Sequence, residues 1–453
     1  MINAKGIFSI LNDQRGVSAV LVAVCLLMLV GLVALSIDVS HLVVARNELQ
    51  NAADAGALAG AAELYTDDGK SVNTNANLVG FDAATANFSE RFPVEVNWTG
   101  GNAGDVQRGH WSFGLGNLSR GFTPNDSTAP VALWGVTTEE LDENPNFINA
   151  VRVRTRRENT PIASWFARIF GYESFDGFAE AVAYIGFAGT LKEATANAPI
   201  AICRQSIETC TDPDDPETCE YDCSQGRFIN DAAGKSDEET GMWTSLEQNI
   251  DTSVSPAVDL CSSGTNASEV KPLVDCTAIK SNSGVDHDSL RYDYSLAVNN
   301  GQIDSAFNAF YNCWKGEFED GYMRLTLPVI DCAEDPTTCA PLVGAVEVVI
   351  VHVTQQPNYK NLPAKKKSIT SEDPKLAAGW DPAEVTCSPG ENPDKCVWED
   401  FAKHFSLFDK DGNLAAYNAK SIYFLKSCDP NIPKGVTGGP NFGTLAEIPV
   451  LVR

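Results

Sequence analysis

The sequence predicts an α+β fold, with a long N-terminal transmembrane helix followed by a β-rich, disulfide-crosslinked exported domain. Three observations lead to this prediction. Residues 17–37 carry no charged side chain, residues 38–64 contain no proline and many alanines, and twelve of the thirteen cysteines lie between Cys203 and Cys428. The first two features predict one long helix, and the third predicts a folded, oxidised region beyond it.

Residues 17–37 (VSAVLVAVCLLMLVGLVALSI) form the predicted transmembrane helix. At 1.5 Å per residue this run spans roughly 30 Å, the thickness of the hydrocarbon core of a bilayer. Residues 1–16 are the predicted cytoplasmic N-terminus, because Lys5 and Arg15 precede the run and basic residues favour the cytoplasmic side. The alternative is a signal peptide cleaved near Ala34-Leu35-Ser36, but signal peptides have shorter apolar segments of about 7–15 residues.

Residues 38–64 are predicted to extend the same helix beyond the membrane. Ala52, Gly56 and Gly60 recur at every fourth position, so they share one helix face that lacks bulky side chains. Another backbone can approach such a face closely. The face therefore predicts a helix-packing site, and its partner is either a second protein's helix or the sheet of this same chain.

The remainder of the chain is predicted to contain two regions. A length of 453 residues fits one large or two moderate domains, and a composition of 43% hydrophobic and 21% charged residues is typical of a folded chain. Residues 65–189 form the predicted first α+β region, in which residues 65–149 show short strands and turns but no helix pattern. Residues 190–453 form the predicted cysteine-rich second region. Its most apolar strand pattern is GAVEVVIVHV at residues 344–353.

The net charge of −27 at pH 7 argues against nucleic acid as a partner, because phosphate binding requires clustered basic side chains. Two short basic runs interrupt the acidic background, at residues 152–157 and 365–367. Solvated surface is the better interpretation of both runs.

The cysteines beyond the apolar run predict a disulfide framework, since their number is even and all lie on one side of the anchor. Short spacings favour three local pairs: Cys261 with Cys276, Cys332 with Cys339, and Cys387 with Cys396. A zinc site that includes Cys219 and Cys223 is the alternative, but oxidation competes for the thiols outside the cytosol. The candidate cysteines are Cys203, Cys210, Cys219, Cys223, Cys261, Cys276, Cys313, Cys332, Cys339, Cys387, Cys396 and Cys428.

The sequence predicts no catalytic, cofactor-binding or metal site. The five histidines are isolated, and no G-x-S-x-G or H-E-x-x-H motif accompanies them. Residues 251–255 match the D-x-S-x-S pattern of metal-dependent adhesion sites, but the preceding residues 245–250 are polar and unlike a buried core strand. A turn rich in serine and threonine is the better interpretation of that segment.

The N-terminal segment contains Arg15-Gly16, the apolar run, Asp38, Arg46 and the phrase LQNAADAGALAGA. In these features it resembles Tad (Flp) pilus-assembly proteins of the TadE/TadG-like family. The resemblance continues in AVRVRT at residues 150–155 and SWFARIFGYESFDGFAEAVAYIG at residues 164–186. The position five residues after Gly16 holds Leu21 instead of the glutamate of prepilins, which argues against processing and polymerisation of that kind.

The resemblance implies a single-pass protein of the bacterial inner membrane, with a cytoplasmic N-terminus and most of the chain periplasmic or directed to the surface. Its implied partners are the lipid bilayer and other pilus-assembly or envelope proteins. Two functions follow as hypotheses. The first is a non-enzymatic component of Tad/Flp pilus assembly or of its attachment to the envelope, and the alternative is a membrane-tethered adhesin or ligand-binding module.

Overall fold

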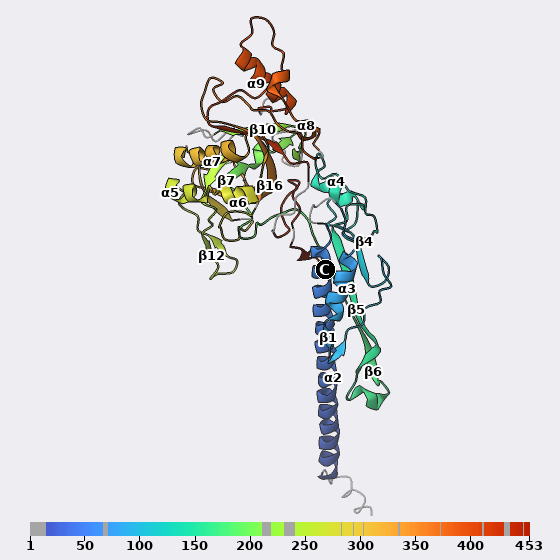
Figure 1. The fold of residues 1–453 in the computed structure, drawn as a ribbon. Coiled ribbons are helices and arrows are strands. Elements are labelled where there is room, and N and C mark those ends of the chain that lie inside the picture. The colour runs from blue at the N-terminus through green and yellow to red at the C-terminus, as the bar shows by residue number, and fades with distance from the viewer. Residues whose placement is uncertain are drawn as a thin grey trace, which may run out of the picture.

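The computed structural model describes residues 15–66, 71–210, 219–230, 241–281, 283–292, 294–301, 303–333, 336–371, 373–409, 412–429, 435–446 and 448–453. Helix α2 extends like a stalk from a folded body that contains two main β-sheets (Figure 1). The first sheet lies along the C-terminal half of α2, and the second lies beyond the end of the helix. The predicted α+β fold class is confirmed.

Helix α2 (Arg15–Ala62) is 48 residues long and runs through the apolar segment and its alanine-rich extension without a break. Alanine is the strongest helix former, and no proline interrupts the run. The helix ends two residues before the predicted end at Leu64, which is within the ordinary uncertainty of a helix boundary.

The prediction of no helix within residues 65–149 is wrong. Helix α3 (Ala76–Thr85) packs beside α2, and α4 (Thr138–Glu143) follows later. The short sequence of α3 has little amphipathic pattern that would predict a helix. Tertiary contacts with α2 and the sheet stabilise it instead. Helix α4 does have a local signal, since Thr137 and Glu140 form a capping box at its N-terminus.

The first main sheet has five antiparallel strands in the order β18-β6-β5-β3-β4. Its central strand β5 alternates buried Val151, Val153 and Thr155 with half-buried arginines, as one covered sheet face requires. The strand bounds are β3 (Val106–Ser112), β4 (Gly121–Pro124), β5 (Ala150–Ala163), β6 (Ser174–Tyr184) and β18 (Val450–Leu451). The C-terminal strand β18 thus returns to the first sheet.

The second main sheet has the order β10-β17-β16-β14-β11-β7-β15, and β15 also pairs with β16, so that five of its strands form a closed circuit. The long strand β16 contains the predicted strand at residues 344–353. The bounds are β7 (Ile200–Cys203), β10 (Gly226–Asn230), β11 (Gly241–Thr244), β14 (Ser295–Asn299), β15 (Met323–Ile330), β16 (Cys339–Thr354) and β17 (Ser421–Lys426).

Two amphipathic helices bury aromatic side chains against the second sheet. Helix α7 contributes Phe307, Phe310 and Trp314 to one core, and α9 contributes Trp398 and Phe401 to another. The helices of this region are α5 (Ala267–Val270), α6 (Cys276–Ser281), α7 (Asp304–Glu317), α8 (Pro374–Ala378) and α9 (Pro393–His404). The 3-10 turns among the described residues are η1 (Ala167–Phe170), η2 (Arg204–Ser206), η4 (Lys271–Leu273) and η5 (Pro382–Glu384).

Three two-stranded sheets complete the described secondary structure. They pair β1 (Phe88–Ser89) with β2 (Phe92–Pro93), β8 (Glu208–Cys210) with β9 (Cys219–Tyr221), and β12 (Ile250–Asp251) with β13 (Val258–Asp259). The predicted division between residues 189 and 190 falls between strands β6 and β7, and it stays a prediction.

Five disulfides crosslink the second region within the described residues. They are Cys203–Cys332, Cys223–Cys428, Cys261–Cys339, Cys276–Cys313 and Cys387–Cys396. Cys219 is also disulfide-bonded, and the side chain of Cys210 lies outside those that the structure describes.

Of the three predicted local pairs, only Cys387–Cys396 is present. The other two are wrong because strand pairing, not sequence spacing, decides which cysteines meet. Strand β14 pairs with the start of β16, which brings Cys339 near the segment that holds Cys261, 78 residues earlier. Cys332 lies two residues after the end of β15, whose parallel neighbour β7 ends at Cys203.

Candidate anchoring site along the N-terminal helix

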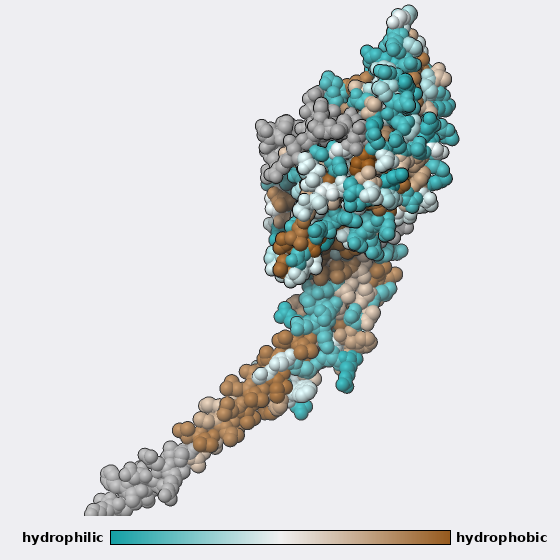
Figure 2. Space-filling model, turned by 90° about the vertical axis from the view of Figure 1, so that its left-hand side faces the viewer, coloured by the Kyte–Doolittle hydropathy of each residue, from teal (hydrophilic) through white to brown (hydrophobic). Residues whose placement is uncertain are grey.

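The apolar part of α2 from Ala19 to Leu35 is exposed among the residues that the structure describes. Its apolar side chains from Val20 to Leu35 are exposed, and Figure 2 shows them as a continuous apolar surface on the stalk. Among the described residues, α2 is the one helix long and apolar enough to cross a membrane, and none of its most apolar stretch is buried. Exposed apolar surface of this extent indicates contact with a partner or a membrane.

The C-terminal half of α2 is, in contrast, part of a protein core. Ala53, Ala57 and Ala61 are fully buried, together with Val151 and Val153 of β5. Two hydroxyl groups tie the helix backbone to its neighbours: Thr155 Oγ1 donates to Leu49 O at 2.8 Å, and Ser89 Oγ donates to Ala45 O at 3.2 Å. The helix therefore changes, without a break, from an exposed apolar rod to a packed core element.

The small residues of the predicted packing face lie at this second half. A Cβ atom on Gly56 would stand 2.8 Å from Gly80 O of α3, and one on Gly60 would stand 3.0 Å from Ala76 O. Both positions also face valine side chains of β5. Ala52 is fully buried beside Val94 and Ala179. The structure thus places α3 and the chain's own sheet against all three positions.

Asp38 directly follows the uncharged run, and its carboxylate binds a distant segment. It accepts hydrogen bonds from the backbone N–H groups of Trp165 at 2.9 Å, Phe166 at 3.0 Å and Ala167 at 2.6 Å. These groups form the N-terminal turn of η1, at the tip of the β5–β6 hairpin. Asp38 is buried, so the bonds hold the tip against α2 at the end of the apolar run. Sequence reasoning noted Asp38 but assigned it no such role.

Further polar contacts hold the same hairpin in place. Glu95 accepts hydrogen bonds from the backbone of Asn159 and Thr160 in the irregular part of β5. Desolvation opposes ionisation of Glu95, but these bonds outweigh it and lower its pKa to about 2. Arg157 is almost fully buried and donates from Nη1 to Ser89 O at 2.5 Å. The hairpin is therefore fixed along its length as well as at its tip.

The basic run at residues 152–157 faces acidic side chains. Arg156 pairs with Asp105 at 2.6 Å, and Arg154 pairs with Glu180. The Arg156–Asp105 bond raises the pKa of the Arg156 guanidinium further above its already high ordinary value. These arginines are therefore engaged within the sheet.

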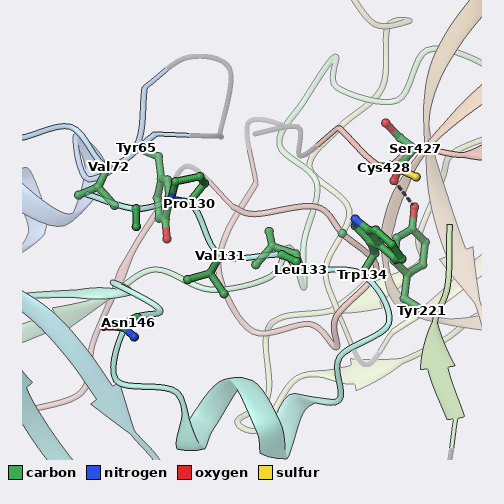
Figure 3. A pocket seen from close by; sticks show the side chains of 13 residues that line it. Tyr65, Val72, Pro130, Val131, Leu133, Trp134, Asn146, Tyr221, Ser427 and Cys428 are labelled. Carbon is green, nitrogen blue, oxygen red and sulfur yellow. Dashed lines mark hydrogen bonds between the residues drawn. The ribbon is translucent and has the colours of Figure 1, made fainter. Parts of the chain in front are cut away.

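A cavity of about 210 Å³ lies where the first region meets the cysteine-rich region (Figure 3). Tyr65 and Val131 line one side, and Trp134 and Tyr221 line the other. Tyr221 donates to Ser427 O at 2.7 Å, and burial raises its pKa well above the ordinary value for tyrosine. The described side chains that line the cavity are mainly aromatic and aliphatic, and burial raises the pKa of Tyr65 as well.

The histidines have structural partners. His110, His287, His352 and His404 each bring a ring nitrogen close to a backbone carbonyl oxygen, and His41 pairs with Glu90. His352 is enclosed by aromatic rings, and burial lowers its pKa to about 3.

The sequence offers two metal sites as alternatives, at residues 251–255 and at Cys219 and Cys223. In the part of the chain that the structure describes, no three His, Cys, Asp or Glu residues are grouped to hold a metal ion. Asp251 accepts hydrogen bonds from the backbone and hydroxyl of Ser253, as a local turn requires. Cys223 is disulfide-bonded to Cys428.

These features define a class of protein: one long N-terminal helix, exposed and apolar at one end, which at the other end is part of a folded α+β unit. Two family models match this part of the chain. The Flp pilus-assembly TadE/G-like model matches residues 16–63, and the Tad-like Flp pilus-assembly model matches residues 59–183. Residues 16–183 therefore match the models of the Tad-like Flp pilus-assembly family, as the sequence resemblance predicted, and this similarity supports a pilus-related role.

No curated protein and no solved structure matches the chain.

Proposed function

We propose that this chain is a membrane-anchored, non-enzymatic component of Flp pilus assembly or of its attachment to the cell envelope. The observation that carries the proposal is the division of α2 into two halves. One half exposes apolar side chains from Val20 to Leu35, while the other half is built into the region that matches the family models. A bilayer is the environment that stabilises the first half while leaving the second half folded.

The proposed orientation has the N-terminus in the cytoplasm and the folded body in the periplasm or directed to the surface. Lys5 and Arg15 precede the apolar run, which favours this orientation. The disulfides of the second region support it independently, because such bonds persist in oxidising compartments such as the bacterial periplasm. The inner membrane is the corresponding proposed location.

The proposed partners are lipid and other pilus-assembly or envelope proteins. The face formed by Ala52, Gly56 and Gly60 is occupied by α3, β5 and β6 of the same chain. This occupancy favours the intramolecular alternative, in which the small residues couple the anchor to the folded body. The surface that binds other assembly proteins is then to be sought elsewhere on the chain.

A pair of arginine substitutions tests the anchor. Leu27→Arg places a charge in the exposed apolar run, whereas Val43→Arg, the matched control, changes an aliphatic side chain beyond it that is also exposed. A central arginine costs about 2.5–3.5 kcal/mol on insertion scales. We therefore expect L27R, but not V43R, to be released from membranes by alkaline carbonate. Equal resistance of both variants to extraction would contradict the proposed anchor.

Orientation and assembly require separate measurements. A periplasm-dependent reporter fused after Leu64 should be active, and a strain that lacks the chain should lose its Flp pili or shed them. A reporter that works there only in the cytoplasm would overturn the orientation, and normal, firmly attached pili would overturn the assembly role.

The cavity beside Trp134 supports the second candidate, a membrane-tethered adhesin or ligand-binding module. Its aromatic lining suits a small apolar or sugar-like ligand. If that candidate holds, Trp134→Ala should reduce cell adhesion while the number of assembled pili stays constant. Loss of pili in this variant would instead favour the assembly role.

A further inference from the structure

The tip of the β5–β6 hairpin exposes a dense group of apolar side chains. Trp165, Ile169, Phe170 and Tyr172 lie within eight consecutive residues and are 59%, 76%, 80% and 62% exposed. We call these four residues the apolar tip. Arg168 is the one charged residue between Ala163 and Tyr172. Isolated apolar residues are common on protein surfaces, but a group of large ones on a single turn marks a contact site.

The position of the apolar tip points to what covers it. Asp38 binds the N–H groups of Trp165, Phe166 and Ala167, and Asp38 follows the last residue of the uncharged run. The ring of Trp165 also lies 5.5 Å, between centroids, from that of His41 on the next turn of α2. The tip therefore lies beside α2 at the level where the exposed apolar run ends (Figure 1).

We propose that the apolar tip is a second membrane contact, which inserts into the interface of the leaflet that α2 leaves at Asp38. This proposal rests on the proposed anchoring by α2 and extends it, because the tip contacts the helix at Asp38 and His41, where the exposed apolar run ends. Tryptophan and tyrosine favour the headgroup level, where an apolar ring body and a polar group are both accommodated. Arg168 can extend its guanidinium to lipid phosphates while its stem stays among apolar groups.

Two contacts would fix the folded body more firmly than a single helix does. A lone helix leaves the body free to rotate about the helix axis and to tilt. A rigid hairpin, bound to the helix by Asp38 and by the Thr155 hydroxyl, which donates to Leu49 O, adds a second point in the membrane plane. The apolar tip would therefore set both the depth and the tilt of the body relative to the bilayer.

Fluorescence of Trp165 provides the test. The full-length chain is reconstituted in vesicles of phosphatidylethanolamine and phosphatidylglycerol, with and without lipids brominated near the headgroup. The chain has eight tryptophans, so the Trp165 signal is the difference between the wild type and Trp165→Phe. We expect W165F to lose most of the bromine-dependent quenching. Trp134→Phe, which removes another exposed tryptophan far from the tip, should retain it.

A matched pair of substitutions on the same hairpin tests the site. Phe170→Glu changes the apolar tip, and Phe178→Glu changes a phenylalanine of similar exposure on β6. Strand β6 begins at Ser174, next to the apolar tip, and Phe178 lies four residues, or roughly 13 Å, farther along this strand. F170E should lower the Trp165 quenching severalfold, whereas F178E should leave it unchanged. Circular dichroism and intact disulfides establish that both variants are folded.

The outcomes separate this proposal from the anchor itself. If carbonate extracts the wild type, the proposed anchoring fails and the interfacial contact fails with it. If the wild type resists extraction but brominated lipid does not quench Trp165, only the interfacial contact is overturned. Crosslinks between the tips of two copies, together with an absence of quenching by brominated lipid, would identify a second copy as the occupant of the tip.

Discussion

Replacement of Gly56 by alanine should destabilise the N-terminal region even though alanine is the better helix former. A Cβ atom at this position would lie 2.8 Å from Gly80 O, 2.9 Å from Ala84 Cβ and 3.2 Å from Val153 Cγ1. The first two distances are shorter than real Cβ contacts allow, and one of them is to backbone. Helices α2 and α3 must therefore move apart to admit a single methyl group.

The expected magnitude follows from two opposing terms. Overpacking of a core costs typically about 1–3 kcal/mol, and backbone neighbours place Gly56 toward the upper part of that range. The gain in helix propensity from glycine to alanine is about 0.8–1.0 kcal/mol. The net loss is then about 1–2 kcal/mol. For a cooperative unit of about 150–250 residues, this lowers Tm by roughly 2–8 °C.

Gly316→Ala is the matched control, because Gly316 is an exposed helical glycine of α7 and a Cβ atom there would meet nothing within 4 Å. It should raise stability by about 0.8–1.0 kcal/mol through propensity alone. Both variants are measured as full-length protein in detergent, by thermal unfolding followed with far-UV circular dichroism. If G56A stabilises the protein as G316A does, the close approach of α2 and α3 is refuted.

Three further predictions concern other parts of the chain. Peptide mapping without reductant should link Cys261 to Cys339, and a Cys261–Cys276 peptide would contradict the strand pairing around β14. Burial lowers the pKa of Lys426 to about 7, below its ordinary value of 10.5, so the unfolded chain binds more protons between these values. The free energy of unfolding should therefore rise as pH increases from 7 toward 10, which is measured as a rise in the urea midpoint. Lys426→Met should reduce this rise, and an unchanged rise in the variant would exclude Lys426 as its cause. Asp38→Ala should speed hydrogen exchange at the amides of Trp165 and Ala167, and unchanged exchange would show that the carboxylate does not hold the hairpin tip.

The N-terminal half of the fold was predictable because its signals are local. An uncharged run of membrane length, an alanine-rich extension and the alternating pattern of residues 150–155 each determine one element through composition or period. The apolar strand at residues 344–353 was predictable for the same reason. None of these predictions required knowledge of which segments meet in space.

The features that were missed depend on distant contacts. Helix α3 is stabilised by Gly56 and Gly60 of α2, and its own ten residues have little amphipathic pattern. The pairing of Cys203 with Cys332 depends on a parallel contact between β7 and β15, across 129 residues. The role of Asp38 depends on a hairpin tip more than 120 residues away. Sequence spacing carries no information about such contacts unless the topology is known.

The continuity of α2 determines how the body is connected to the proposed anchor. A flexible linker would let the body move freely, but here one helix passes from the exposed run into the packed core without a proline. From Asp38 to Ala62 the helix rises roughly 36 Å at 1.5 Å per residue. Along this length Asp38, Ala45, Leu49 and Gly56 each contact a different segment of the first region. A force on the folded body is therefore distributed over many short contacts to one stiff helix, as the proposed attachment of a pilus to the cell envelope requires.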